Sequence, residues 1–320
     1  MSRLLGTLLT IISIVMSCSV SAQTYPTRPI KVVVPNGPGS GSDTLTRLIT
    51  EELSKSLGQP VIVENKAGAN GIVASEYVAN AKPDGYTLLV GTSSTHGSNP
   101  SLVLNLSYDP IKQFTPITRV SFSTYFIVVD PKLPIHSVQD LVNFAKSTPG
   151  GISYAYGNST SLIMAETFFR ALNLKPKKVS YRSIPPALLD IIGGRVNMMF
   201  ADMTSSMAQV QAGSLRALAV TSPERTSLAP QLPTIRATAL PDYDIETWIA
   251  FFGPGGLPES ITNRLSSEIT RIIREPKISA RIAELGAEVR PLSGKEFETW
   301  LAADIKNWTR LVKNAEIQAE

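Results

Sequence analysis

Short apolar runs alternate with amphipathic stretches along most of the chain. Residues 30–34 and 61–63 have the continuous apolar character of buried strands. Between them, apolar positions within residues 43–57 recur with the spacing of one helix face, which predicts a helix packed against the strands. Asp43 is the expected N-cap of this helix, and Gly58 is expected to end it.

The same alternation continues to the end of the chain and begins afresh near residue 125. It predicts parallel strands joined by helical crossovers, and therefore an α/β fold built from two units. The further strands are expected at residues 86–90, 126–129, 196–200, 215–221 and 247–252 and near residues 152 and 179. The further helices are expected at residues 71–81, 137–146, 159–172, 185–192, 205–211, 258–274, 278–285 and 294–314.

The first residues indicate export. Arg3 precedes an apolar stretch over residues 4–16, and Ala22 ends a run of small residues at the usual cleavage spacing. This pattern is typical of a secretory signal peptide, so we expect residues 1–22 to be removed. Cys18, the only cysteine, would be lost with it; the alternative is a lipoprotein anchored through Cys18.

Composition narrows the possible partners. The formal net charge is +4, with 30 basic and 26 acidic residues spread along the chain, whereas nucleic-acid binding requires basic residues clustered on one face. We therefore expect no nucleic-acid partner. With a hydrophobic content of 43%, the chain is long enough to fold into one large or two medium domains.

Three turns share a composition that suits anion binding. In each, a short apolar strand runs into a cluster of Gly, Ser, Thr or Asn that starts a helix, within residues 32–43, 88–99 and 152–162. Glycine lets the main chain approach a ligand closely, and free N–H groups at a helix start attract negative charge. Three such turns facing one cleft would form a receptor for a carboxylate.

Motifs throughout the mature chain, in order, resemble those of the Bug-type receptors. These receptors are the extracytoplasmic substrate-binding proteins of tripartite tricarboxylate transporters. The motifs are VVP followed by Gly-rich sequence and Asp43, LGQPVIVENKAGANG, KPDGYTLLVGTSSTHGSNPSL, YDPIKQFTPIT, the turn at 154–161, GGRVNMMFAD, GSLRALAVTSPER and LSGKEFETWLAADIKNWTRLVK.

The resemblance implies a type II periplasmic-binding-protein fold with the ligand between two lobes. One lobe is expected to contain residues 23–123 and 226–320, and the other residues 124–225. It also implies a periplasmic, non-enzymatic receptor without a cofactor or metal, which captures a small carboxylate and works with integral membrane transporter subunits. The implied ligand-binding positions are Asn36, Gly39, Ser40, Gly41 and Asp43; Thr92, Ser93, Ser94, Thr95 and His96; Gly157, Asn158, Ser159, Thr160 and Ser161; and Asp202.

The chain departs from the family pattern in two of its loops. Asn36 replaces the usual aromatic residue after VVP, and the usual YKGGGPA is replaced by YRSIPPA at residues 181–187, which loses glycines and turns Lys into Arg182. Arg182 could bind a carboxylate bidentately or lie on the surface.

Two other positions also allow two interpretations. His96 could contact a ligand, although a lone loop histidine is more often a solvated or hydrogen-bonded bystander. Asp202 could accept a hydrogen bond from a ligand hydroxyl or amine, or cap the helix that follows it.

Two further functional classes stay open from the residues alone. A hydrolase would need a nucleophile elbow, but the sequence contains no Gly-x-Ser-x-Gly, and the glycines at 37 and 39 lack the third glycine of a dinucleotide site. A receptor that reports to a membrane sensor requires the same closing lobes as a transport receptor. The sequence therefore does not separate sensing from transport.

Overall fold

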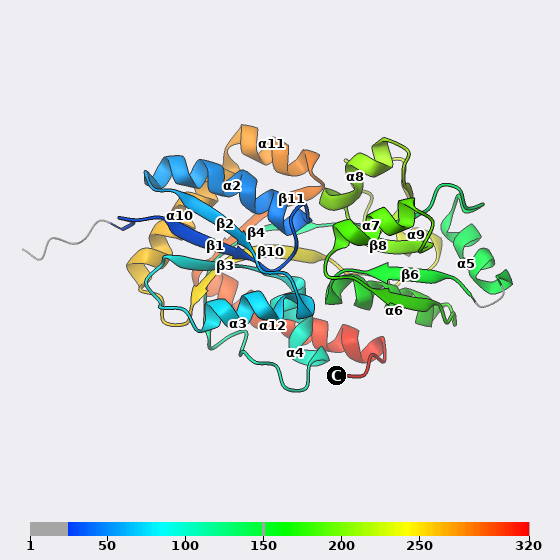
Figure 1. Ribbon diagram of the computed structural model, residues 1–320, viewed down its shortest axis with the longest axis horizontal. Coiled ribbons are helices and arrows are strands. Elements are labelled where there is room, and N and C mark those ends of the chain that lie inside the picture. The colour runs from blue at the N-terminus through cyan, green and yellow to red at the C-terminus, as the bar shows by residue number, and fades with distance from the viewer. Residues whose placement is uncertain (1–24, 149–150, 320) are drawn as a thin grey trace, which may run out of the picture.

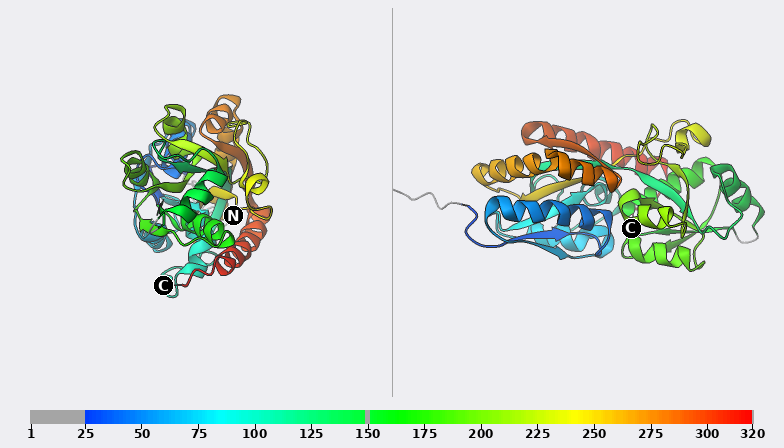
Figure 2. Two further views of the ribbon diagram at one scale, coloured as in Figure 1. Left: turned by 90° about the vertical axis from the view of Figure 1, so that its right-hand side faces the viewer. Right: turned by 90° about the horizontal axis from the view of Figure 1, so that it is seen from above.

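The protein consists of two α/β lobes arranged end to end (Figures 1 and 2). The computed structural model describes residues 25–148 and 151–319, so the expected signal peptide and Cys18 lie outside the described residues. Within the described part, no helix has both the length and the apolar character needed to cross a membrane.

The first lobe is built on a six-stranded sheet in the order β11-β4-β10-β3-β1-β2. Its strands are β1 (Ile30–Val34), β2 (Val61–Asn65), β3 (Thr87–Thr92), β4 (Phe114–Ser123), β10 (Thr247–Pro254) and β11 (Ala287–Ser293). Its helices are α2 (Gly41–Leu57), η1 (Ala69–Gly71), α3 (Ile72–Ala79), η2 (Ser93–Ser98), α4 (Asn99–Leu102), α10 (Glu259–Arg274), α11 (Pro276–Glu284) and α12 (Gly294–Asn314).

The second lobe is built on a five-stranded sheet in the order β7-β6-β8-β5-β9. Its strands are β5 (Tyr125–Val129), β6 (Ser153–Tyr156), β7 (Lys177–Ser180), β8 (Met198–Asp202) and β9 (Arg216–Val220). Its helices are α5 (Val138–Ser147), α6 (Ser159–Ala171), α7 (Ile184–Ile192), α8 (Met203–Gln211) and α9 (Ile235–Thr238).

The expectation of parallel strands joined by helical crossovers is confirmed for only part of each sheet, because both sheets are mixed. β1 pairs in parallel with β2 and β3, and β6 with β7 and β8. The strands on which the chain passes between the lobes are antiparallel to their neighbours: β10 runs against β3 and β4, and β5 runs against β8 and β9. A crossing strand enters its sheet from the other lobe, so no helical crossover fixes its direction.

Helix α2 begins earlier than the sequence pattern predicts. Ser40, with an extended backbone, is the N-cap, and its side chain accepts from the N–H of Asp43. Asp43 therefore lies in the first turn, where its negative charge interacts favourably with the helix dipole, and its expected role as the cap was wrong. The apolar face behaves as expected, with Leu45, Ile49 and Leu53 buried.

The segment that leads back to the first lobe packs with the second. Ala229, Ile235 and Tyr243 are buried in the core of the five-stranded sheet, and Val220 forms a bridge with Thr234. We therefore propose that the chain returns to the first lobe near residue 246, where β10 begins, instead of at residue 226. A second connection is made by α12, whose last turns bury their apolar side chains in the same core.

Candidate functional site

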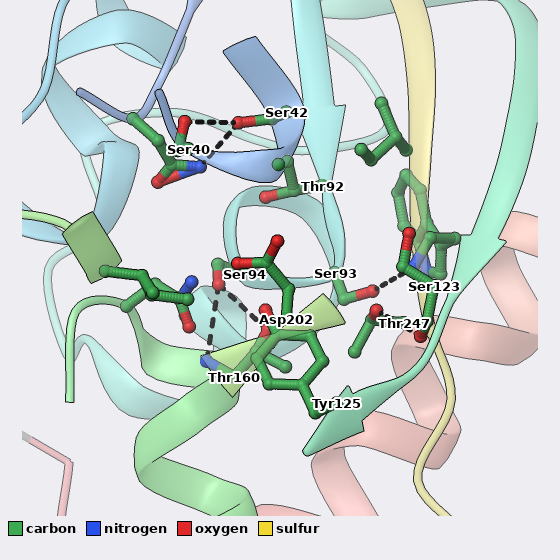
Figure 3. A pocket seen from close by; sticks show the side chains of 16 residues that line it. Ser40, Ser42, Thr92, Ser93, Ser94, Ser123, Tyr125, Thr160, Asp202 and Thr247 are labelled. Atoms are coloured by element: carbon green, nitrogen blue, oxygen red, sulfur yellow. Dashed lines mark hydrogen bonds between the residues drawn. The ribbon is translucent and has the colours of Figure 1, made fainter. Parts of the chain in front are cut away.

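A cavity of about 40 Å³ lies between the two lobes, and all three predicted turns reach it (Figure 3). Its wall contains residues from both sheets. The lining residues are Asn36, Ser40, Gly41, Ser42, Thr92, Ser93, Ser94, Ser123, Tyr125, Asn158, Thr160, Ile184, Asp202, Thr247, Trp248 and Ile249.

The first turn presents polar side chains at the start of α2. Asn36 Nδ2 donates to Ser42 Oγ at 2.9 Å, and the hydroxyls of Ser40 and Ser42 lie 3.3 Å apart. The sequence hypothesis included Ser40 and Asn36; Ser42 lies within the same loop and also lines the cavity. Gly41, the first residue of α2, is at the cavity as well.

Asp43 and Gly39 hold this turn together from behind the cavity. Asp43 Oδ2 accepts from Gly39 N at 2.9 Å, and its Oδ1 accepts from Asn65 and from Arg47. Burial by itself raises the pKa of the Asp43 carboxyl, but these hydrogen bonds outweigh it and lower the pKa below its usual value. Neither residue lines the cavity, so their position favours a supporting role.

The second turn is a single turn of π-helix, η2, which follows β3 directly. Thr92 and Thr95 form a reciprocal capping box at its start, and Thr92, Ser93 and Ser94 line the cavity. Because π-helical turns often occur at functional sites, this geometry agrees with a binding role for the turn.

His96 lies away from the cavity, inside the first lobe. Its ring stacks on Phe252 with centroids 4.2 Å apart, and Nδ1 lies 3.0 Å from Thr95 Oγ1. Complete burial lowers the pKa of His96 to about 3, so the ring is neutral at physiological pH. The interpretation of His96 as a hydrogen-bonded bystander agrees with this position, although the side chain lies in an aromatic core and not in solvent.

The third turn starts α6 in the second lobe and meets the second turn across the lobes. Asn158 accepts from Ser161 N at 2.8 Å, and Ser161 Oγ accepts in return from Asn158 N. Asn158 and Thr160 line the cavity, and the Thr160 hydroxyl lies 2.9 Å from Ser94 Oγ.

The other residues of the third turn support it. Ser159 and Ser161 point into the protein, and Ser159 Oγ lies 2.8 Å from Ser98 Oγ of the first lobe. A Cβ at Gly157 would collide with the main chain of Ser183 and Ile184, so this glycine permits close packing between two loops of the second lobe. It does not line the cavity.

The capping role of Asp202 is confirmed, whereas a hydrogen bond from a ligand to this residue stays a prediction. Its Oδ1 accepts from Ser205 N at 2.8 Å, which caps α8, and the same carboxyl lines the cavity. Complete burial raises its pKa above the usual value, and the hydrogen bonds from Ser205 oppose this shift. Arg182, by contrast, is exposed and is not among the lining residues.

The sequence hypothesis missed one wall of the cavity, which comes from strand residues. These are Ser123, Tyr125, Thr247, Trp248 and Ile249, together with Ile184 at the start of α7. Thr247, Trp248 and Ile249 fall within an expected strand, whereas no strand was expected at Ser123. The pairing of β4 with β10 places Ser123 opposite Thr247.

The cavity wall can neutralise an anion only through neutral donors. Asp202 is the one carboxylic acid among the sixteen lining residues, and none of them is Lys, Arg or His. A carboxylate would be held by N–H groups and hydroxyls at the three helix starts. Among residues 25–148 and 151–319, no group of three His, Cys, Asp or Glu side chains is arranged to hold a metal ion.

Comparison with known proteins agrees with this arrangement. BugT of Bordetella pertussis is 30% identical over 301 residues, with 93% of this chain and 92% of BugT covered. Two solved structures are similar along their whole length, and each covers 92% of this chain. The periplasmic binding protein BugD has a TM-score of 0.89 at 29% identity, and Rpa4515 of R. palustris, solved with adipate, has a TM-score of 0.90 at 30% identity.

The profile of one family spans most of the sequence. It is described as "Tripartite tricarboxylate transporter family receptor" and matches residues 45–317. Members of this family are solute-binding receptors of the periplasm, and they are not enzymes. The two lobes, the cavity between them and the match over residues 45–317 lead to one conclusion: this chain belongs to the tripartite tricarboxylate transporter receptor family.

Proposed function

We propose that this protein is a periplasmic receptor that captures a small carboxylate by closure of its two lobes and delivers it to the membrane subunits of a tripartite tricarboxylate-type transporter. The observation that carries the proposal is the convergence of three helix starts, two from the first lobe and one from the second, on one cavity without cationic side chains. Ligands named for two relatives support the class, since Rpa4515 was solved with adipate and MatC of Rhodopseudomonas palustris with malate.

The energetics require an enclosed site. One helix start contributes about 0.3 to 1 kcal/mol to binding an anion at the surface and about 2 kcal/mol when partly buried. Three of them fall short of the roughly 8 kcal/mol of a micromolar complex. The rest must come from hydrogen bonds in a site shielded from water, and only the closed form brings both lobes to the ligand.

Closure explains why the cavity residues are divided between the lobes. Ser40, Ser94 and Ser123 belong to the first lobe, whereas Thr160 and Asp202 belong to the second. A ligand that bonds to both sets favours the closed form by the free energy of the contacts that only that form makes.

Calorimetric titration with a panel of small carboxylates and their neutral amides tests the proposal. We expect at least one carboxylate to bind with micromolar or better affinity and to reduce the radius of gyration in solution scattering, and the matching amide to bind at least a hundredfold more weakly. Thr160→Ala should weaken that binding, because it removes the hydroxyl beside Ser94. Equal binding of acid and amide, or no binding of any carboxylate, would contradict the proposal.

The location and the transport role need separate tests. Mass spectrometry of the protein from a periplasmic extract should find a mature N-terminus at residue 23, and a lipid-modified Cys18 would contradict this cleavage. Uptake of the bound carboxylate by cells should stop when the genes for the membrane subunits of the transporter are deleted. Unchanged uptake would instead favour a sensing role.

A further inference from the structure

The cavity has a second polar region, in which residues at strand ends lie beside the first residue of η2. It consists of Ser123 at the end of β4, Thr247 at the start of β10 and Ser93, and Figure 3 shows these three on the opposite side of the view from Ser40. We call this region the strand wall. Strand residues offer side-chain hydroxyls here, whereas the helix starts offer concentrated N–H groups.

Ser123 is the clearest sign that the strand wall binds something. The residue is only 8% exposed, it lines the cavity, and its Oγ has no hydrogen-bond partner. A buried hydroxyl without a partner costs about 1 to 3 kcal/mol, so such a group is normally satisfied. Thr247 Oγ1 donates to the carbonyl oxygen of Ser123 at 2.8 Å, which leaves its own lone pairs free.

Asp202 adds an acceptor with unused capacity. Ser205 supplies only two hydrogens to this carboxyl, one from N and one from Oγ, although a carboxylate can accept about four hydrogen bonds. The remaining lone pairs lie in a wall that has no cationic side chain. Like charges repel strongly in such an enclosed site. A ligand with two carboxylates would therefore place three acids together without a counterion.

We propose that Asp202 and the strand wall form a subsite for a hydrogen-bond donor, so that the preferred ligand is a small monocarboxylate bearing an ammonium or hydroxyl group. The carboxylate of the ligand faces the helix starts, and its donor faces Asp202 and Ser123. This inference rests on the proposed function and specifies the ligand class, which differs from a plain dicarboxylate such as adipate.

Four acids with four-carbon chains separate the contribution of the donor group to binding from that of the carboxylate. They are butanoate, 4-aminobutanoate, 3-hydroxybutanoate and succinate. In calorimetric titrations we expect the amino and hydroxy acids to bind at least tenfold more tightly than butanoate, and succinate to bind at least tenfold more weakly than either. One hydrogen bond to a charged group corresponds to about a tenfold to hundredfold change in affinity.

Two variants and a matched control assign the effect to the subsite. Asp202→Asn should abolish the preference for 4-aminobutanoate over butanoate, and it should still fold because Asn is as good an N-cap as Asp. Ser123→Ala should reduce the preference for 3-hydroxybutanoate severalfold. Ser121→Ala removes another buried hydroxyl without a partner from the same strand, but outside the cavity, and should leave all four affinities unchanged.

The outcomes distinguish failure of this inference from failure of the receptor function. If succinate or butanoate binds as tightly as the two donor-bearing acids, the subsite proposal is overturned while the carboxylate receptor stands. The same holds if Asp202→Asn keeps the ammonium preference. If none of the four ligands and no other carboxylate binds to the parent protein, the proposed function itself fails.

Discussion

The two lobes meet along two sides that differ in chemistry. On one side, the start of α2 and the loop at residues 285–286 touch the start of α8; we call this side the mouth. On the other side, η2, α4 and α12 pack against α6; we call this side the seam. Figure 1 shows α2 and α11 beside α8 at the top, and α4 and α12 below α6.

The contacts at the mouth are of a kind that allows the two lobes to separate. Gly41 and Gly286 lie directly against Asp202 and Met203 of the other lobe, with no room for a side chain. The one hydrogen bond to a main-chain group here joins Thr204 Oγ1 to Leu285 O. Apart from Met203, the groups that meet here are glycines and polar side chains, so we expect opening this side to cost little hydrophobic free energy.

The seam, in contrast, is continuous with a core. Leu102 of α4 and Trp308, Leu311 and Val312 of α12 are buried together with the residues of the second sheet. Separating the lobes here would expose these side chains to water, at about 25 cal/mol for each Å² of apolar surface. The comparison indicates that the seam stays closed and acts as the pivot, while the mouth opens and closes.

The largest effect is expected at the seam, from Trp308→Ala. The indole is fully buried and lies against Gly97 of η2, so truncation leaves a large cavity. We expect the free energy of unfolding to fall by about 3 to 5 kcal/mol in urea titrations followed by circular dichroism. Trp308→Phe should cost much less, because it keeps an aromatic ring in the buried site. If Trp308→Ala unfolds at the parent's urea concentration, the seam is not the common core of the lobes.

At the mouth, Gly41→Ala should affect binding instead of stability. A Cβ at residue 41 would collide with Asp202 Oδ1 and would lie 3.2 Å from Thr204 Cβ. Asp202 is fixed by its bonds to Ser205, so the lobes must part. We expect carboxylate affinity to fall about a hundredfold, or about 2.7 kcal/mol, and the radius of gyration of the mixture to stay at its ligand-free value.

A matched control exists for this substitution. Gly193 also has an ordinary negative φ of −76°, it lies at the end of α7, and an added Cβ would approach no atom closer than 3.3 Å. Gly193→Ala should therefore keep the parent's affinity. Unaltered binding in Gly41→Ala would show that the mouth does not need this close contact.

The sequence allows good prediction of those parts of the site that depend on local signals. Gly, Ser and Asn at helix starts are stereochemical requirements of capping and close approach, and all three turns meet at the cavity. The strand wall could not be predicted in this way, because Ser123 and Thr247 are 124 positions apart and meet only through the pairing of β4 with β10. Which strands pair depends on residues that are far apart in the sequence, and the local hydrophobic pattern does not encode it.

The errors in predicted roles have a similar origin. A position in a binding turn does not reveal which way its side chain points, and successive residues of a helix start face different directions. His96 follows two lining serines, yet its ring enters an aromatic core. Asp43 was assigned from its neighbours in the sequence, whereas its carboxylate also accepts from the distant Asn65.

Ser159 belongs to the seam, although its neighbour in the same turn lines the cavity. It lies next to the lining residue Thr160, but its hydroxyl bridges Ser98 and the side chain of Asn99 across the seam. Ser159→Ala leaves the buried Asn99 Oδ1 without its donor, whereas Ser98 Oγ still donates to Ser94 O, so we expect a loss of about 1 to 2 kcal/mol in the free energy of unfolding. Carboxylate affinity should change less than twofold. A large loss of affinity with full stability would instead place this hydroxyl in the ligand site.

The smallest effect should come from Asp304, which connects α12 to the strand behind the cavity. Its Oδ2 accepts from Trp248 Nε1 at 2.6 Å, and burial raises the pKa of the carboxyl to about 6, although Trp248 and Arg119 oppose the shift. The native state therefore binds this proton more tightly than the unfolded chain does. Its contribution to stability is present at low pH and is lost as the pH rises through 6.

Asp304→Asn removes this titration while the amide oxygen can still accept from Trp248. Lowering the pH from 7 to 5 should raise the free energy of unfolding of the parent by about 1 kcal/mol more than that of the variant, in urea titrations at both pH values. Asp202 and Glu246, whose pKa values are also raised by burial, titrate equally in both proteins and cancel in the difference. Because Asp304 lies on α12, the effect should appear in stability and leave carboxylate affinity unchanged. An equal pH response in the two proteins would mean that this carboxyl is not shielded as its burial implies.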